Sequence, residues 1–286
     1  MSTPLILLQD VITLIQDQLR LITELRRRVY YSKLDVFATN LALVALGIRA
    51  GYLLDIFTFE KPVDLSNKIL SALRACTTTK EYFSEPTGFS TASEEFFIQH
   101  HIRETVWRSR DRRSALLNSI FELLIETTEL KKLRVVPEPI LQCCSYLQEY
   151  LSAAPVPLSI SFPEDMSTTV AVPVAGVLLD YLVAYVPESA EAAPLSNISL
   201  DFYEVIIISK GHTPPSRTGT KGTTDTFRHS IMKFSCTSSL SGMEDLQPQT
   251  IIDRLQTLFE GRLKESNVHG SIEIVHSTAL VPHLSF

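Results

Sequence analysis

The most apolar stretch of the chain runs from Val170 to Val186, and Asp180 is its only charged residue. A helix that crosses a bilayer needs roughly 20 predominantly apolar residues. This stretch is shorter and is interrupted by Pro173 and Gly176, so membrane insertion is not expected. It is instead expected to lie inside the protein, as a helix that leads into a buried strand. The stretch therefore locates the core, but it carries no catalytic motif.

The rest of the composition indicates a folded chain with a large core. Hydrophobic residues make up 45% of the 286 residues, which excludes disorder of the whole chain. Domains typically contain about 50–250 residues. Because no polar linker divides the sequence, we expect one α+β domain over residues 1–286. The alternative is a helix-rich half over residues 1–152 and a strand-rich half over residues 153–286.

The first half has the periodicity of helices. Between residues 5 and 31, apolar residues recur every three or four positions, which predicts one continuous helix with an apolar face. This face either packs on the protein's own sheet or binds a partner protein. Its central residues are Leu8, Ile12, Ile15, Leu19 and Ile22. Further helices are expected over residues 34–49, 65–76 (with Asp64 as N-cap), 114–133 and 139–151.

After residue 153 the pattern changes to that of strands. Short connections between neighbouring strands favour antiparallel pairing, and Pro248 opens one last helix. Residues 80–93 and 212–226 are rich in Pro, Gly, Ser and Thr and are expected to be loops. We therefore predict an α+β fold in which the helical N-terminal half packs on a mainly antiparallel C-terminal sheet. The predicted strands cover residues 156–162, 181–186, 198–208, 227–235 and 270–275.

Cysteine spacing and net charge limit the class of protein. The four cysteines, Cys76, Cys143, Cys144 and Cys236, fit neither a zinc site nor a secreted disulfide framework. We expect reduced thiols, no metal and no cofactor, and a location in the cytoplasm, the nucleus or both. The formal charge of −6 disfavours a general nucleic-acid-binding role.

Two aspartates have apolar neighbours in the sequence. Asp55 lies in or at the end of an expected short strand over residues 51–57, and Asp180 lies where the helix of the apolar stretch meets the next strand. A buried carboxylate without a partner is costly, so each is expected to reach solvent, a hydrogen-bond donor or a ligand. Both are therefore candidate ligand contacts. Asp180 also fits a turn in which the carboxylate binds exposed backbone amides.

A mixed group of ionisable residues consists of His100, His101 and Arg103. Adjacent histidines point apart on a helix or a strand, so a metal site is not expected there. These residues are candidate ligand contacts in the second hypothesis below, and a solvated surface is the simpler interpretation.

Arg110, Arg112 and Arg113 form a basic cluster near Trp107, the only tryptophan. Basic residues beside an aromatic ring suit single-stranded nucleic acid or an acidic partner. Because the whole chain is acidic, we expect an anion or an acidic protein in preference to nucleic acid. A second basic run, from Arg26 to Arg28, ends the first helix, where its charge complements the helix dipole.

Several catalytic motifs are excluded by spacing. The segment from Gly219 to Thr224 lacks the order of glycines and lysine in a phosphate-binding loop, and Gly-x-Ser-x-Gly does not occur. Cys236 and His229 are seven residues apart on one expected strand. They project from opposite faces if that strand is unbroken, so a cysteine–histidine dyad is not expected.

Three segments, Val174–Tyr185, Leu200–Val205 and His229–Cys236, resemble the chromosome 1 open reading frame 74-like proteins, a eukaryotic family. The block from Leu34 to Asp55 is also similar in style. Within the first segment this chain has Leu-Leu-Asp-Tyr-Leu where the family has Leu-Leu-Gly-Tyr-Pro. The resemblance implies a single α+β fold and implies no particular chemistry.

These observations leave two hypotheses. In the first, the chain is a non-enzymatic intracellular protein-interaction factor, a subunit of a larger complex, whose helical face over residues 8–22 meets another protein. In the second, it is a small-ligand-binding protein or an enzyme of unrecognised type with a site near Asp55 and Asp180. Convergence of these acids in one deep pocket favours the second hypothesis, and exposure of the helical face favours the first.

Overall fold

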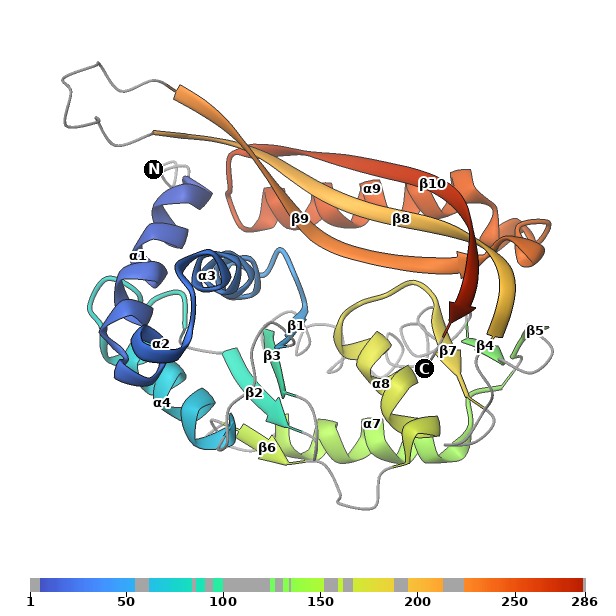
Figure 1. The fold of residues 1–286 in the computed structure, drawn as a ribbon, viewed down its shortest axis with the longest axis horizontal. Coiled ribbons are helices and arrows are strands. Elements are labelled where there is room, and N and C mark those ends of the chain that lie inside the picture. The colour runs from blue at the N-terminus through green and yellow to red at the C-terminus, as the bar shows by residue number, and fades with distance from the viewer. Residues whose placement is uncertain are drawn as a thin grey trace.

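The computed structural model describes most of the chain. The described residues are 6–54, 62–83, 86–90, 95–99, 124–126, 131–133, 135–151, 159–161, 167–187, 195–212 and 224–284. The fold is α+β, with helices in the N-terminal half and a long antiparallel sheet in the C-terminal part (Figure 1). The predicted fold class is therefore confirmed.

The N-terminal helical region begins with α1 (Leu8–Leu21) and α2 (Thr23–Arg28). The prediction of one continuous helix was wrong, because Ile22 adopts an extended conformation between the two. Two longer helices follow, α3 (Tyr31–Ala45) and α4 (Pro62–Ala75). Asp64 lies inside the first turn of α4, so it is not the N-cap that the sequence suggested.

Three long strands form the C-terminal sheet in the order β10-β8-β9, with both pairs antiparallel. They are β8 (Leu195–His212), β9 (Thr224–Thr237) and β10 (Gly270–Leu284). Burial alternates along β8, where Tyr203, Val205 and Ile207 are buried and the residues between them are partly exposed. One face of the sheet is thus packed and the other faces solvent, as is common for antiparallel sheets.

A β-bulge changes which residues of β9 face the core. Met232 pairs with Val205 while Ser230 pairs with Ile206, so Ile231 is an extra residue in β9. The bulge reverses the alternation, so the partly buried His229 and the buried Cys236 lie on the same face. The opposite placement was predicted for an unbroken strand, a condition that β9 does not meet. They still form no dyad, because they pair with Ile207 and Asp201, a separation of about 20 Å along a strand.

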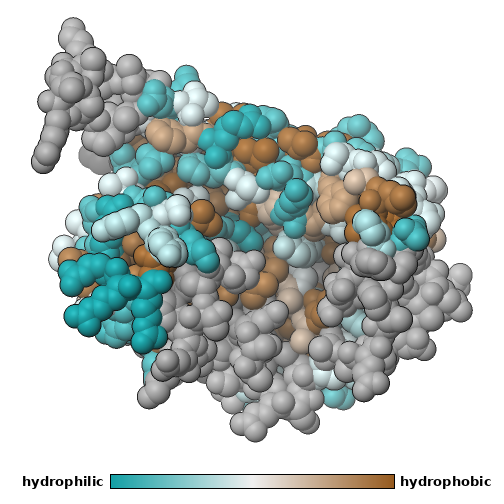
Figure 2. All heavy atoms as spheres, viewed as in Figure 1, coloured by the Kyte–Doolittle hydropathy of each residue, from teal (hydrophilic) through white to brown (hydrophobic). Residues whose placement is uncertain are grey.

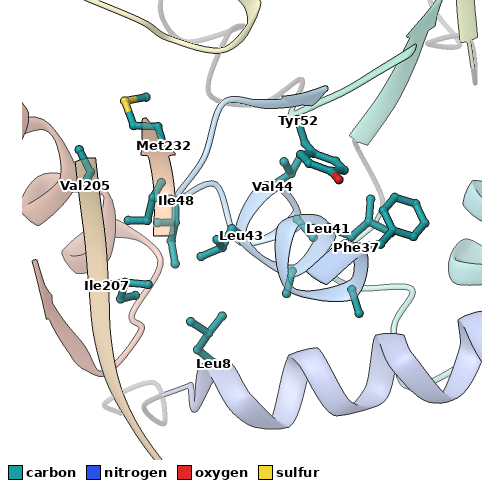
Figure 3. Packing of buried hydrophobic residues seen from close by; sticks show 14 of the residues in the cluster. Leu8, Phe37, Leu41, Leu43, Val44, Ile48, Tyr52, Val205, Ile207 and Met232 are labelled. Carbon is teal, nitrogen blue, oxygen red and sulfur yellow. The ribbon is translucent and has the colours of Figure 1, made fainter. Parts of the chain in front are cut away.

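The main core lies between the inner face of the sheet and the helices. Figure 3 shows Leu8 of α1 and Leu43 of α3 packed near Val205, Ile207 and Met232 of the strands. Helix α9 (Pro248–Glu265) adds further apolar residues to the same buried cluster. Because one cluster contains residues from the first helices and from the last strands, the two ends of the chain are packed into a common interior.

A second apolar cluster joins α7 (Glu138–Leu151), α8 (Thr168–Leu178) and β7 (Ala184–Val186). The apolar stretch that begins at Val170 thus forms the expected helix and short strand. The other elements are β1 (Gly51–Leu53), β2 (Pro86–Ser90), β3 (Glu95–Gln99), β4 (Leu124–Glu126), β5 (Lys131–Lys132), β6 (Ser159–Ser161), and the 3-10 helices η1 (Ser238–Leu240) and η2 (Glu244–Leu246).

Two small sheets correct the sequence predictions. One has the order β1-β3-β2-β6, and β2 occupies part of residues 80–93, which were expected to be a loop. The other has the order β5-β4-β7 and includes two strands within residues 114–133, which were expected to be a helix. Here β4 pairs in parallel with β7, so a contact distant in sequence overrides the local helical pattern.

Candidate functional site

Asp180, one of the two acids predicted to contact a ligand, is partly buried and is bound by another side chain. Its carboxylate forms an ion pair with the Arg262 guanidinium of α9. Arg262 also donates to the Ile48 carbonyl oxygen at 3.3 Å, and its guanidinium lies 5.4 Å from the centre of the Phe259 ring. Asp180 has φ 64°, a left-handed turn conformation that aspartate tolerates. The carboxylate therefore anchors the turn after α8 to α9.

Asp201 of β8 is a buried acid that was not among the predicted site residues. Its Oδ1 accepts a hydrogen bond from Thr278 Oγ1 at 2.6 Å and lies 3.1 Å from His276 Nε2, both on β10. Burial alone would raise the pKa of Asp201, but hydrogen bonds from Thr278, His276 and Ser238 outweigh it and hold the pKa below its usual range. The sequence did contain a signal for it: the alternation of apolar residues along β8 places Asp201 on the apolar face of that strand.

Asp201 and His276 supply an acid and an imidazole, as in hydrolytic sites, but the thiol next to them, that of Cys236, is unsuitable as a nucleophile. The nearby Cys236 is buried, and burial together with the negative charges of Asp201 and Asp245 raises its pKa to about 12. A thiol must ionise to attack. The His276 ring instead stacks on Tyr203 with centroids 4.9 Å apart. The arrangement thus joins the two strands.

A third polar group lies where α1 meets the sheet. The buried atoms Gln9 Oε1, Ser209 Oγ and His229 Nε2 make no hydrogen bond within the described structure. Helix α1 approaches β8 closely here, since a Cβ on Gly211 would lie 2.9 Å from the Gln9 Cβ atom. Burial lowers the pKa of His229, so this imidazole is kept neutral.

The helical face that was predicted to meet a partner lies in the main core. Leu8, Ile12, Ile15, Leu19 and Ile22 are all buried. Helix α1 packs on α3 and on β8. Of the two alternatives left by the sequence, packing on the protein's own sheet is therefore the one observed, and this face is not available to another protein.

The surface next to that buried face is exposed and both aromatic and basic. The side chains of Leu21, Tyr30 and Tyr31 are 73%, 77% and 71% exposed, the three arginines of α2 are also exposed, and all lie around the connection from α1 to α3. Figure 2 shows hydrophilic side chains gathered at the end of the molecule where Figure 1 places α2. We name this surface the aromatic–basic patch, formed by Leu21, Arg26, Arg27, Arg28, Tyr30 and Tyr31.

Contacts between α1 and α3 hold the patch together. Gln16 Nε2 donates to Asp35 Oδ1 at 3.1 Å, and Arg20 lies 3.7 Å from the same carboxylate. Tyr31 is one helical turn before Asp35, so it lies beside the end of α1 that carries Leu21. The sequence analysis identified the arginine run but explained it by the helix dipole alone. The adjacent Tyr30 and Tyr31 were the signal that it overlooked.

All of the other predicted site residues lie outside the described part of the chain. This holds for Asp55, His100, His101, Arg103, Arg110, Arg112 and Arg113. Convergence of Asp55 with Asp180 therefore stays a prediction.

Two surface cavities are formed by described residues. One, of about 280 Å³, lies at the starts of α7 and α8 and is lined by apolar residues such as Ile140 and Val170. The other, of about 410 Å³, lies between the end of α9 and the start of β10. Neither is lined by Asp180 or Asp201. Within the described ranges, His, Cys, Asp and Glu side chains form no group of three or more suited to a metal ion.

No helix in the described portion of the chain is long and apolar enough to span a membrane. No family model, no curated protein and no solved structure matches the chain. The resemblance to the chromosome 1 open reading frame 74-like proteins therefore stays a prediction.

Proposed function

We propose that this protein is a non-enzymatic, intracellular protein-interaction factor that belongs to a larger complex and holds its partner through the aromatic–basic patch. The observation that carries the proposal is the exposure of Leu21, Tyr30 and Tyr31 beside three arginines. Tyrosine and arginine are the side chains, with tryptophan, that most often dominate binding energy at protein interfaces. Three large apolar side chains together on a surface indicate an interaction site more strongly than single ones do.

The acids in buried positions support a structural role for the interior. Asp180 is bound by Arg262, and Asp201 by Thr278 and His276. Each of these contacts links elements that are distant in sequence. The intracellular part of the proposal is supported by the four cysteines, which form no disulfide, as is usual in reducing compartments.

Affinity purification of the full-length tagged protein, followed by mass spectrometry, tests the proposal. The wild-type chain is compared with the double variant Tyr30→Ser/Tyr31→Ser. The matched control is Val275→Ser/Leu280→Ser, which removes two exposed apolar side chains of β10. We expect a reproducible set of co-purifying proteins that the tyrosine variant loses and the control retains. An identical set for all three proteins contradicts the proposal.

A further inference from the structure

We infer that the segment bound by the aromatic–basic patch is an acidic stretch of polypeptide that also carries apolar side chains. This inference rests on the proposed function, because it specifies the partner of the same surface. Three features support it: the balance of charge around the patch, the start of α3, and the apolar side chains between the charges.

The charge around the patch is positive although the whole chain carries −6. Three described acids lie nearby: Glu24 binds Lys68 at 2.6 Å and also interacts with the charge of Arg27, and Asp17 and Asp35 both contact Arg20. The described cations of this region outnumber these three acids, and they are Arg20, Arg26, Arg27, Arg28, Lys33 and Lys68. The exposed arginines of α2 therefore add to a local excess of basic groups. Such an excess attracts an anionic surface and repels a cationic one.

The start of α3 adds to this positive charge. Tyr30 is the N-cap residue of α3, its side chain makes no capping hydrogen bond, and the first turn contains no acidic residue. Helix N-termini carry a partial positive charge and exposed N–H groups, which Asp or Glu normally compensate. A carboxylate of the bound segment can take that role at the same place where the arginines lie.

The apolar part of the patch requires more than charge from the partner. Leu21, Tyr30 and Tyr31 are exposed and flank the arginine run in the sequence. Burying them on binding adds affinity to that of the arginines, which also set orientation and association rate. A purely acidic tail leaves these side chains exposed, so the expected segment alternates carboxylates with leucine, phenylalanine or similar residues.

Site-specific photo-crosslinking in cells identifies the bound segment. The full-length protein carries a benzophenone amino acid in place of Tyr31, and the control carries it in place of Val275 on the sheet. After irradiation and digestion, mass spectrometry reads the crosslinked peptide. We expect a peptide in which Asp and Glu outnumber Lys and Arg and which contains apolar residues. A neutral or basic peptide overturns this inference alone. If Tyr31 yields no more crosslinked protein than Val275 does, the proposed function fails as well.

Binding of the captured segment as a synthetic peptide then tests the role of charge. The triple variant Arg26→Glu/Arg27→Glu/Arg28→Glu is expected to bind it roughly tenfold or more weakly, and raised salt to weaken wild-type binding. Unchanged binding overturns the inference. Vesicles that contain phosphatidylserine provide the last comparison. The patch binds anionic lipid if the wild type sediments with these vesicles, the triple variant does not, and the crosslinking experiment captures no protein. That combination overturns both proposals.

Discussion

Asp201 is a single residue that links the central strand of the sheet to its C-terminal edge strand. The carboxylate belongs to β8, and its donors Thr278 and His276 belong to β10. In the register, Asp201 is directly opposite Thr278. A slip by one residue places the acid opposite different side chains and turns it away from its donors. A buried acid on an apolar face therefore favours one pairing of the two strands.

Replacing Asp201 with Asn is expected to destabilise the protein by about 1–3 kcal/mol at neutral pH, since a charge-assisted acceptor is lost in a buried position. The folded-state pKa of Asp201 is below its usual value. Its ionised form thus stabilises the fold above the unfolded pKa of about 3.9, and that contribution is lost as pH falls through the lower folded-state pKa. Urea unfolding of both proteins at several pH values measures the difference. The difference should shrink as pH falls below about 4.

His229 is expected to destabilise the folded protein when the pH is lowered. Burial lowers its pKa, and its Nε2 makes no hydrogen bond within the described structure. At pH values below the unfolded pKa of about 6.5, this imidazole binds a proton more readily in the unfolded chain than in the folded one. The free energy of unfolding therefore decreases as the pH is lowered. Phe removes this titration and can retain the parallel stacking on Phe227. His229→Phe should therefore gain stability relative to the wild type as pH falls from about 7 to 5. A difference that does not vary with pH would show that His229 does not titrate on unfolding.

At the scale of elements, side-chain contacts from α9 join two parts of the fold that are distant in the sequence. Arg262 binds the Asp180 carboxylate after α8 and the Ile48 carbonyl oxygen after α3. These contacts bring together the main core and the cluster of α7 and α8. Removing one member of a buried ion pair leaves an uncompensated charge and can cost about 3–5 kcal/mol. The pair is thus expected to matter more than exposed pairs do.

A double-mutant cycle on Asp180 and Arg262 tests this connection. The variants are Asp180→Asn, which tolerates the left-handed turn conformation, Arg262→Met, and the two combined. We expect Arg262→Met to cost about 3 kcal/mol and the double variant to cost less than the sum of the single ones, by about 1 kcal/mol or more. The control cycle uses Arg228→Met and Glu273→Gln, an exposed pair with an Arg228 Nη1 to Glu273 Oε2 distance of 2.7 Å. Its coupling should be within about 1 kcal/mol. Equal coupling in the two cycles would contradict a special role for α9.

The spacing of apolar residues was enough to predict those elements whose buried face follows directly from that spacing. The face from Leu8 to Leu19 and the alternation around Val205 both followed from spacing. The break at Ile22 could not be predicted, because Ile22 and Leu25 are both buried and the spacing of three continues through the break. No proline or glycine marks the position.

Contacts between distant segments account for the other differences. The strands β4 and β5 lie in a region of helical pattern and exist through pairing with each other and with β7. The bulge at Ile231 reverses the side of β9 on which His229 lies. For the candidate site, the arginine run was visible in the sequence, whereas the burial of Leu8 and the exposure of Tyr31 depend on how α1 and α3 pack.

At the scale of the whole molecule, the N-terminal helices are part of the core and not an attached arm. Residues of α1, α3, α9 and all three long strands belong to one buried cluster. The aromatic–basic patch consists of exposed residues at the end of α1, on α2 and at the start of α3, in the region where Figure 1 places α2. The proposed interaction uses exposed side chains of this region and folding uses its buried ones, so changing exposed side chains separates the two.

Two variants of this region should behave differently. Deleting residues 1–32 removes Leu8, Ile12 and Leu19 from the core. Each such loss costs about 2–5 kcal/mol, so the three together cost about 6–15 kcal/mol, as much as the typical total stability of about 5–15 kcal/mol. We expect the truncated chain not to fold.

The charge reversal of Arg26, Arg27 and Arg28 changes only exposed side chains, with a cost of about 1 kcal/mol per residue or less from the helix dipole, and should retain the fold. Circular dichroism with thermal unfolding compares both with the wild type. Cooperative unfolding of the truncated chain would show that α1 is dispensable and that its apolar face can serve a partner after all.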